Sequence, residues 1–304
     1  MATETDSLPL IRTKLYRPRI AGGLVPRPRL LERLEERRGR PLTLVSAPAG
    51  YGKTTLISGW VEVCDCPSAW VSLDEGDDDL VLFLTYLLAA IETMFPSAVA
   101  ETQALLRAAS LPPLPALTRS LINGLDQIEC SFILVLDDYH YIRNIAIHDL
   151  LNDLLAYPPR SMHLALISRK DPPLNLVRLR ARRQVTEVRT PDLRFTREET
   201  AAFVRQEMGA PIDDSAVGAL LQRVEGWVTG LRLVTLSLRH QESVEISPAR
   251  LQGGVSYVAE YLAAEVLESQ PQVIQDYLLS TSILDRFCAS LCQAVQFGTT
   301  GLPK

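Results

Sequence analysis

The sequence predicts an α/β fold in which a parallel sheet carries helices on both faces. Three observations support this prediction. Short apolar runs alternate with longer helical patterns from Leu42 to Val188, as in successive strand–helix units. The run 132–136 is continuously apolar, which is expected of a parallel strand buried on both faces. Beyond Thr196 the pattern becomes entirely helical, so a helical part is expected to follow the sheet.

The first apolar run, 42–45, leads through a loop of small residues into a helical pattern. Residues 47–55 read APAGYGKTT. Glycines in such a loop can adopt positive φ, so successive N–H groups turn inward around a phosphate. The N-terminus of the following helix adds partial positive charge. Ala47 replaces the first glycine of the usual G-x-x-x-x-G-K-[ST] pattern. The context nevertheless predicts a phosphate-binding P-loop, with a plain small-residue turn as the alternative.

We expect a nucleotide to be held by the loop and the start of the helix. The predicted binding residues are Ala49, Gly50, Tyr51, Gly52, Lys53, Thr54 and Thr55. The Lys53 ammonium is expected to reach the β- and γ-phosphates, and the Thr54 hydroxyl to ligate Mg²⁺. The preceding segment, 24–36, predicts a helix with proline in its first turn. Because a segment in this place often wraps the base, Arg27 and Arg29 are also predicted at the nucleotide, with solvent-facing side chains as the alternative.

The other elements follow from the same patterns. Strands are predicted over 69–73, 132–136, 163–167 and 185–188. Helices are predicted over 80–94, 100–109, 116–127 and 145–156. In the helical part they are predicted over 197–208, 213–224, 227–239, 257–267, 272–280 and 287–295. Thr196, with glutamate three residues later, predicts a capping box at the start of the first of these.

Charged residues follow two of the buried runs. Asp137 and Asp138 follow 132–136, where an acidic residue would hold Mg²⁺ and a second would polarise an attacking water. A pair of turn aspartates is the alternative. Arg169 emerges after 163–167, and ligands of open α/β sheets bind at carboxyl strand ends. We therefore expect Arg169 to contact a γ-phosphate. For His140 we favour a structural role over contact with nucleotide or water.

Composition excludes several classes of protein. At 304 residues, two or three domains are expected. The net charge of −5 argues against a basic nucleic-acid binder. The arginines at 178, 180, 182 and 183 are expected to form a solvated helix face, with a phosphate-contacting patch as the alternative. No apolar run reaches the ~20 residues of a membrane span, and residues 1–15 lack the apolar core of a signal peptide. A cytoplasmic protein is expected.

The cysteines predict no metal centre. Cys64 and Cys66 form one pair, and Cys288 and Cys292 another, with Cys130 left over. Neither pair has the C-x2-C spacing typical of zinc sites. Reduced structural thiols are therefore the favoured interpretation.

Five ordered motifs carry a family resemblance. They read APAGYGKTT, LDDYH, SRKDPPLNLVRLRAR, DLRFTREE and EGWVTGLRL. Together they resemble the nucleotide-binding part of MalT-type, LuxR-family ATP-dependent transcriptional regulators, which belong to the STAND class of signalling P-loop ATPases. The resemblance extends from Leu24 to Val295. It implies nucleotide and Mg²⁺ roles for Lys53, Thr54 and Asp137, a catalytic role for Asp138 and γ-phosphate sensing by Arg169.

The resemblance also implies a domain order. An N-terminal arm (1–23) would precede a P-loop domain (24–189), a small helical domain (190–240), a winged-helix-like domain (241–296) and a tail (297–304). The hinge that the class places at a G-x-P motif cannot be located, because Glu225-Gly226-Trp227 has no proline. The only charged residues of 259–276 are acidic, and no arginine is present, so the terminal helical block is expected to pack against protein rather than read DNA.

The implied function is a regulatory switch. Bound ADP would hold a closed monomer, and exchange for ATP, with slow hydrolysis, would control an open, self-associating form. The alternative is a nucleotide-stabilised scaffold with little hydrolysis; a metabolic kinase is disfavoured because no acceptor site or substrate lid is recognisable. Members of the family continue into helical sensor repeats and a C-terminal DNA-binding helix-turn-helix, and this chain ends before both. We expect an unknown inducer, and DNA contact only through such a further domain.

Overall fold

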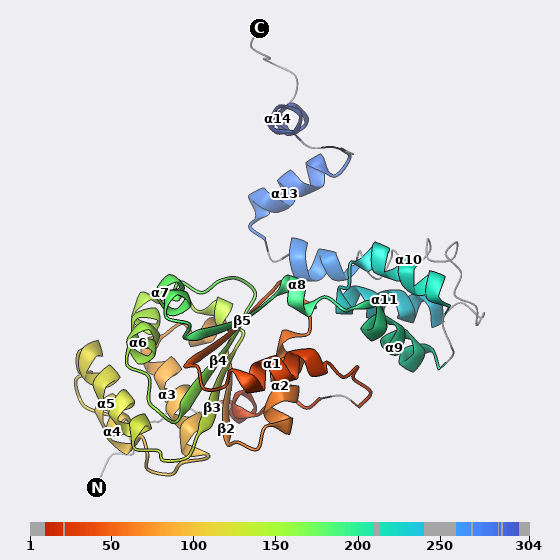
Figure 1. Cartoon of the computed structure of the whole chain (residues 1–304). Helices are drawn as coiled ribbons and strands as arrows, with labels where there is room; N and C mark the ends of the chain where they lie inside the picture. The colour runs from red at the N-terminus through yellow and green to blue at the C-terminus, as the bar shows by residue number, and fades with distance from the viewer. Residues whose placement is uncertain are drawn as a thin grey trace.

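A computed structural model describes residues 10–20, 22–209, 213–239, 260–268, 270–284, 286 and 288–297. Its centre is a five-stranded, all-parallel sheet (Figure 1). The strands are β1 (Leu42–Ser46), β2 (Ser68–Ser72), β3 (Phe132–Asp137), β4 (Met162–Ser168) and β5 (Val185–Arg189). Each lies within one or two residues of its predicted range. The α/β fold class is confirmed.

The strand order places the ends that matter beside one another. The order is β2-β3-β4-β1-β5, so β4 lies between the strand before the P-loop and the strand that ends in Asp137. Ser46 pairs with Ser168, and Leu136 with Leu166. The loops that follow β1, β3 and β4 therefore emerge together at one edge of the sheet.

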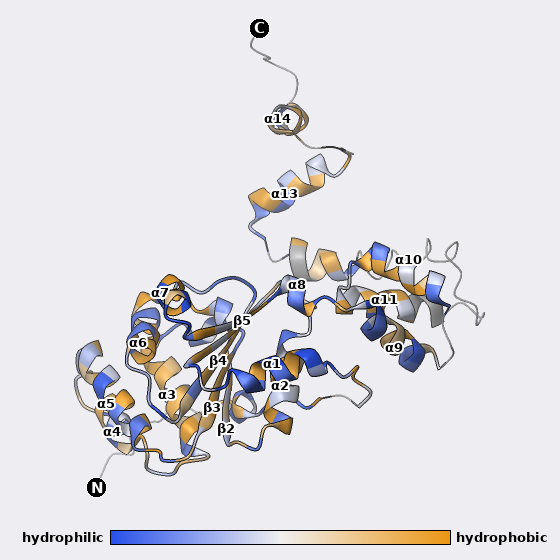
Figure 2. Ribbon diagram, in the orientation of Figure 1, coloured by the Kyte–Doolittle hydropathy of each residue, from blue (hydrophilic) through white to orange (hydrophobic). Residues whose placement is uncertain are grey.

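Helices cover both faces. Figure 1 shows α1 and α2 on one side and α3, α5, α6 and α7 on the other. Their bounds are α1 (Pro28–Glu36), α2 (Lys53–Val63), α3 (Leu80–Glu92), α4 (Ala100–Leu106), α5 (Leu114–Asp126), α6 (Ile145–Ala156) and α7 (Leu176–Ala181). Alternate strand residues feed two separate cores: Leu134 and Leu136 face the α3 side, while Ile133 and Val135 face the α2 side. The strands are accordingly mostly apolar, and β3 is apolar from Phe132 to Leu136 (Figure 2).

A short helix, α8 (Thr190–Leu193), connects the sheet to three packed helices. These are α9 (Arg197–Met208), α10 (Asp214–Val224) and α11 (Val228–Arg239), and we call them the helical unit. Phe195, Phe203, Leu220 and Leu231 contribute to a third core that belongs to this unit. The predicted capping box is confirmed, because Thr196 accepts from the Glu199 N–H and Glu199 accepts from the Thr196 N–H.

The chain continues through a π-helical turn, Ala263–Leu267, to α13 (Gln272–Thr281) and α14 (Ala289–Phe297). The predicted helices over 272–280 and 287–295 correspond to these two. The first residues of the helix predicted over 257–267, and the segment 241–259, lie outside the described residues. In the part of the chain that the structure describes, no helix combines the length and apolarity needed to cross a membrane.

Candidate functional site: a nucleotide cradle at the sheet edge

The loop after β1 is built by two left-handed glycines. Gly50 has φ 78° and Gly52 has φ 75°, a region that glycine enters without steric cost. Gly52 is the N-cap of α2, so the first N–H groups of α2 follow it directly and lack intrahelical partners. A Cβ placed on Gly52 would meet no atom within 4 Å. The loop therefore leaves open space in front of a helix N-terminus.

Lys53 lies at this N-terminus and is 7% exposed. Its ammonium donates to the carbonyl of Pro48 at 2.9 Å, so the side chain folds back over the loop. Burial lowers the pKa of Lys53, and the nearby Arg169 charge lowers it further, while Asp138 and Asp137 act in the opposite direction. An ammonium has three N–H donors, so Lys53 can also bind anionic acceptors besides the Pro48 carbonyl.

Thr54 and Asp137 come from different elements and meet at the sheet edge. The Thr54 hydroxyl donates to Asp137 Oδ1 at 3.1 Å. Burial raises the pKa of Asp137 to about 7, helped by the negative charge of Asp138 and opposed by the Thr54 hydrogen bond. A hydroxyl and a desolvated carboxylate, both oxygen donors, form the ligand pair that Mg²⁺ prefers. These two residues therefore fit the ligand chemistry of a Mg²⁺ ion.

Asp138 is held in an unusual backbone conformation, with φ 56° and ψ 36°. Aspartate tolerates this left-handed region better than most residues. The turn separates the two carboxylates: Asp137 is buried, whereas the Asp138 side chain is 42% exposed. A strained residue at a strand end is a frequent mark of function. The Asp138 carboxylate is therefore partly open to solvent, and its role in orienting water stays a prediction.

Arg169 follows the last residue of β4, and its charge acts on both Lys53 and His140. The structure thus brings together five of the predicted residues: Lys53, Thr54, Asp137, Asp138 and Arg169. We call this group the cradle. Ala49, Gly50 and Tyr51 form the loop itself, with Tyr51 packed against the α2-side core, and Thr55 is exposed on the first turn of α2.

His140 also belongs to this group. Its Nδ1 lies 3.7 Å from Asp138 Oδ1 and has no hydrogen-bond partner among the described residues. Burial lowers the pKa of His140 to about 4, and the charges of Arg169, Lys53 and Lys170 add to this effect. The imidazole is therefore neutral, and it faces the carboxylate that would orient water. No spacing in the sequence indicates that His140 lies beside Asp138.

The helical unit contacts the P-loop directly. Trp227 Nε1 donates to the carbonyl of Ala49 at 3.1 Å, and the Thr229 N–H donates to the carbonyl of Gly50 at 3.1 Å. A Cβ on Gly50 would lie 2.6 Å from Trp227 Nε1 and 2.7 Å from Thr229 Oγ1. Gly50 is thus required for the close approach as well as for the turn. The sequence predicts a P-loop that contains Gly50 and a helix that contains Trp227, but it carries no signal that the two are in contact.

Arg29 faces the helical unit. Its guanidinium donates to Glu199 Oε1 at 3.1 Å and to the carbonyl of Asp192 at 2.8 Å. Arg27 donates to the carbonyl of Leu193 at 2.8 Å and pairs with Glu199 at 3.3 Å, both side chains being 9% exposed. Arg27 and Arg29 therefore form a clasp, together with Glu199, between the start of α1 and the helical unit. The solvent-facing alternative is wrong for Arg27, and nucleotide binding by Arg29 stays a prediction.

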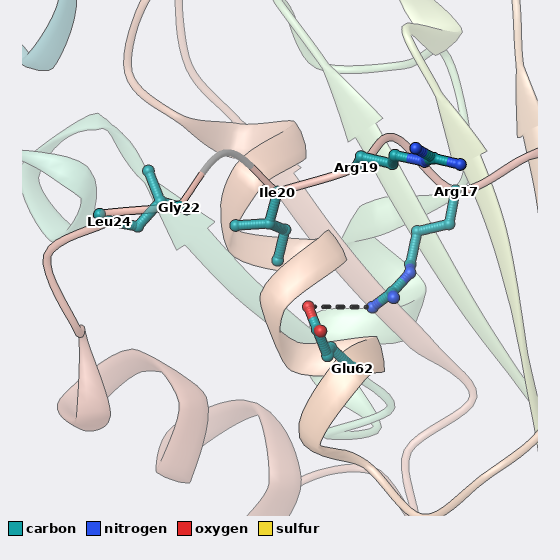
Figure 3. A pocket seen from close by; sticks show the side chains of 7 residues that line it. Arg17, Arg19, Ile20, Gly22, Leu24 and Glu62 are labelled. Carbon is teal, nitrogen blue, oxygen red and sulfur yellow. Dashed lines mark ion pairs between the residues drawn. The ribbon is translucent and has the colours of Figure 1, made fainter.

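A hollow of about 460 Å³ lies elsewhere, between the N-terminal segment and α2. In Figure 3, Arg17 reaches toward Glu62 across it, and these two groups pair at 3.4 Å. Glu62 is the second-last residue of α2, and Lys53 is the first. A helix rises about 1.5 Å per residue, so the hollow is more than two helical turns from the P-loop. It is therefore separate from the cradle.

Comparison with known proteins places this geometry in a family. A model of the MalT winged helix domain matches residues 263–300. The HTH-type transcriptional regulator MalT of Klebsiella pneumoniae is 36% identical over 277 residues, which is 90% of this chain and 31% of the relative. MalT of Yersinia pestis gives the same values. The chain belongs to the MalT-type family.

This MalT-type chain spans 31% of the length of the relatives it matches. The winged-helix match begins later than the expected boundary at 241 and extends into the expected tail; the other domain boundaries stay predictions. Two solved structures share the fold. The Walker-type ATPase of Pyrococcus abyssi gives a TM-score of 0.55 at 14% identity, covering 92% of this chain and 86% of the other.

The second is a Signal Transduction ATPase with Numerous Domains from Pyrococcus horikoshii that carries a tetratricopeptide repeat sensor. Its TM-score is 0.51 at 18% identity, over 91% of this chain and 37% of the other. At these identities the two structures show the fold alone. They confirm that the MalT-type chain is built on a P-loop ATPase sheet.

Proposed function

We propose that this chain is the nucleotide-controlled switch of a MalT-type transcriptional regulator. It binds ATP or ADP with Mg²⁺ in the cradle, hydrolyses ATP slowly, and changes the position of the helical unit in response. The proposal rests on one observation: the P-loop contacts both the cradle and the helical unit. Its inner side faces the cradle with Lys53, while its outer carbonyls at Ala49 and Gly50 bind the helical unit.

The residues of the cradle have distinct tasks. Lys53 leaves the Pro48 carbonyl and contacts phosphate oxygens, which compensate its buried charge better than one neutral acceptor does. Thr54 and Asp137 hold Mg²⁺, whose bound charge neutralises the phosphates. Asp138 orients a water and accepts its proton, and His140 limits the positions open to the carboxylate. Arg169 contacts the γ-phosphate.

The switch follows from differential contact. A ligand shifts a two-state equilibrium only if it interacts differently with the two states. ATP and ADP differ in the γ-phosphate, so Arg169 distinguishes them. Any change in the P-loop that turns the carbonyls of Ala49 or Gly50 weakens the hydrogen bonds from Trp227 and Thr229. The helical unit is then released from the loop, and the surfaces that it covers become available for self-association.

The partners of the whole regulator are part of the proposal. An inducer of unknown chemistry would act on regions beyond this chain, and DNA would be bound through a further domain. This part of the protein would itself contact nucleotide and, in its ATP form, other copies of the chain.

The test starts with the purified chain. Released nucleotide is identified by mass spectrometry, and affinities for ATP and ADP are measured by calorimetry. Charge-assisted hydrogen bonds contribute about 1.5–3 kcal/mol each, so Lys53→Ala should weaken both affinities at least about tenfold. Lys170→Ala is the matched control, because Lys170 carries a charge near the same edge. Equal losses in both variants, or unchanged affinity in Lys53→Ala, would exclude this cradle.

ATP turnover distinguishes the switch from the alternative, a nucleotide-stabilised scaffold. A switch that resets by hydrolysis releases phosphate from ATP under single-turnover conditions. A scaffold binds both nucleotides and releases none above the rate of a Lys53→Ala control.

A further inference from the structure

Two cysteines meet in a tight turn at the end of α2, outside the nucleotide cradle. The Cys64 N–H donates to the carbonyl of Trp60 at 2.9 Å and closes the helix. The Cys66 N–H donates back to the carbonyl of Cys64 at 2.8 Å, the pattern of a γ-turn. Such a turn contracts the chain, which favours the short Cα separation of a disulfide. Cys64 is 8% exposed and Cys66 is half-buried, with exposed Asp65 between them.

The two sulfur atoms have different surroundings. Arg38 Nη1 donates to Cys64 Sγ at 2.8 Å. Cys66 Sγ donates to the carbonyl of Ser131 at 3.1 Å and also hydrogen-bonds Cys64. A guanidinium beside a sulfur stabilises the thiolate form. Burial raises the pKa of Cys66 to about 11, and the neighbouring Cys64 sulfur adds to this effect, so the second sulfur keeps its proton.

We propose that Cys64 and Cys66 form a peroxide-sensitive dithiol, in which Cys64 is the reacting thiolate and Cys66 the resolving thiol. The geometry supplies each requirement: a nucleophilic sulfur beside a cation, a protonated partner two residues away, and a turn at the surface. Small oxidants such as hydrogen peroxide reach this turn from the Asp65 side.

The reaction balances with peroxide as the oxidant. The Cys64 thiolate attacks one peroxide oxygen, forming an S–O bond and breaking the O–O bond. Sulfur is oxidised to sulfenic acid, and the leaving hydroxide takes up a proton to give water. Cys66 sulfur then attacks the sulfenic sulfur, forming the S–S bond and breaking the S–O bond. The thiol proton leaves with the hydroxyl group as a second water.

Metal binding is the competing use of a thiol pair, and the structure disfavours it. The Arg38 guanidinium repels a cation at the Cys64 sulfur. Among the described residues, no cluster of three or more histidine, cysteine or acidic side chains could hold a metal ion. Oxidation needs only the two sulfurs and the positive charge that are present.

The test uses the full chain, reduced and then exposed to hydrogen peroxide at pH 7. Samples taken over time are alkylated and mapped with trypsin, which yields 54–107 with both turn cysteines, 120–143 with Cys130, and 287–304 with the other two. We expect 54–107 to lose two hydrogens and to react at least about tenfold faster than the exposed Cys130. In Cys66→Ser, a dimedone adduct of a sulfenic acid should appear on Cys64.

Matched variants test the cause. Arg38→Gln removes the cation that donates to the Cys64 sulfur and should slow the reaction by about tenfold, whereas Arg38→Lys keeps the charge and stays near the parental rate. Arg37→Gln is the neighbouring control, and circular dichroism checks the fold of each variant. The proposal is overturned if Cys130 reacts as fast as the turn, or if no disulfide forms. It is also overturned if folded Arg38→Gln reacts at the parental rate.

Discussion

The indole N–H of Trp227 donates to the backbone carbonyl of Ala49 across 178 residues of sequence, at 3.1 Å. The carbonyl belongs to the P-loop, and the indole belongs to the helical unit. The ring is itself packed over Gly230, where an added Cβ would lie 2.3 Å from the ring. This packing fixes the indole, so the hydrogen bond is directional and sensitive to rotation of the Ala49 peptide.

Trp227→Phe tests whether this contact retains nucleotide. The substitution keeps an aromatic ring and removes the N–H, and a hydrogen bond contributes about 0.5–1.5 kcal/mol. We expect release of a fluorescent ADP analogue to accelerate by about two- to tenfold in stopped-flow measurements. Trp70→Phe is the control, because Trp70 Nε1 donates to Ser72 on β2 instead. Equal acceleration in both variants would assign the effect to general destabilisation.

Asp138→Ala separates hydrolysis from binding. Asp138 is exposed at the edge of the cradle, whereas Asp137 is buried against Thr54. Loss of a group that orients and deprotonates water should lower single-turnover hydrolysis by about 10²-fold or more, with ATP affinity retained. Asp137→Ala should instead weaken the Mg²⁺-dependent part of ATP binding. A parental rate in Asp138→Ala would contradict the catalytic role.

Arg169→Ala tests nucleotide discrimination. If Arg169 reads the γ-phosphate, its removal should bring the affinities for ATP and ADP close to equality, because the remaining contacts are common to both nucleotides. Calorimetry on the parent and the variant measures the two ratios, and Arg182→Ala, on an exposed part of the chain, is the control. An unchanged ATP/ADP ratio would place the sensor at another residue.

Glu199→Gln tests the clasp. The variant keeps the shape of the side chain but removes the charge shared by Arg27 and Arg29. Since hydrogen bonds to charged groups contribute about 1.5–3 kcal/mol, the free energy of unfolding should fall by about that amount in urea titrations. Glu198→Gln, an exposed neighbour on the same helix, should have little effect.

The same variant predicts a pH dependence. Burial alone would raise the pKa of Glu199, but the hydrogen bonds from Arg29 and the Thr196 N–H, and the charges of both arginines, lower it overall. A lowered pKa in the folded state contributes stability above the unfolded value of about 4.3. That contribution is lost as pH falls through the folded pKa. The stability difference between parent and Glu199→Gln should therefore be constant near pH 7 and shrink below about pH 4. A constant difference at all pH values would contradict this assignment.

Most of the sheet could be predicted from the sequence, because parallel strands buried on both faces appear in it as short, mostly apolar runs. The runs at 132–136 and 163–167 contain the β3 and β4 cores almost to the residue. The P-loop and Asp137 were predictable for a related reason, since glycine positions and strand-end charges are local features. The prediction that they converge on one edge followed from the parallel arrangement alone.

Contacts between residues far apart in the sequence could not be predicted in this way. The sequence places Trp227 at the start of the helix predicted over 227–239, and nothing near it in sequence indicates Ala49 as its partner. Arg27 looked like a candidate for nucleotide or solvent, yet it is buried against Glu199. Both outcomes depend on how the helical unit packs against the sheet, which is a property of shapes that form only after each part has folded.

The clasp also has a consequence for biosynthesis. Arg27 leaves the ribosome 172 residues before Glu199, a delay of roughly 10 to 30 seconds at ordinary translation rates of about 5–20 residues per second. During that time the two arginines at the start of α1 remain hydrated. When Glu199 emerges, its carboxylate can pair with two arginines that were synthesised 172 and 170 residues earlier. The clasp therefore cannot form before residue 199 has been synthesised, however fast α1 itself folds.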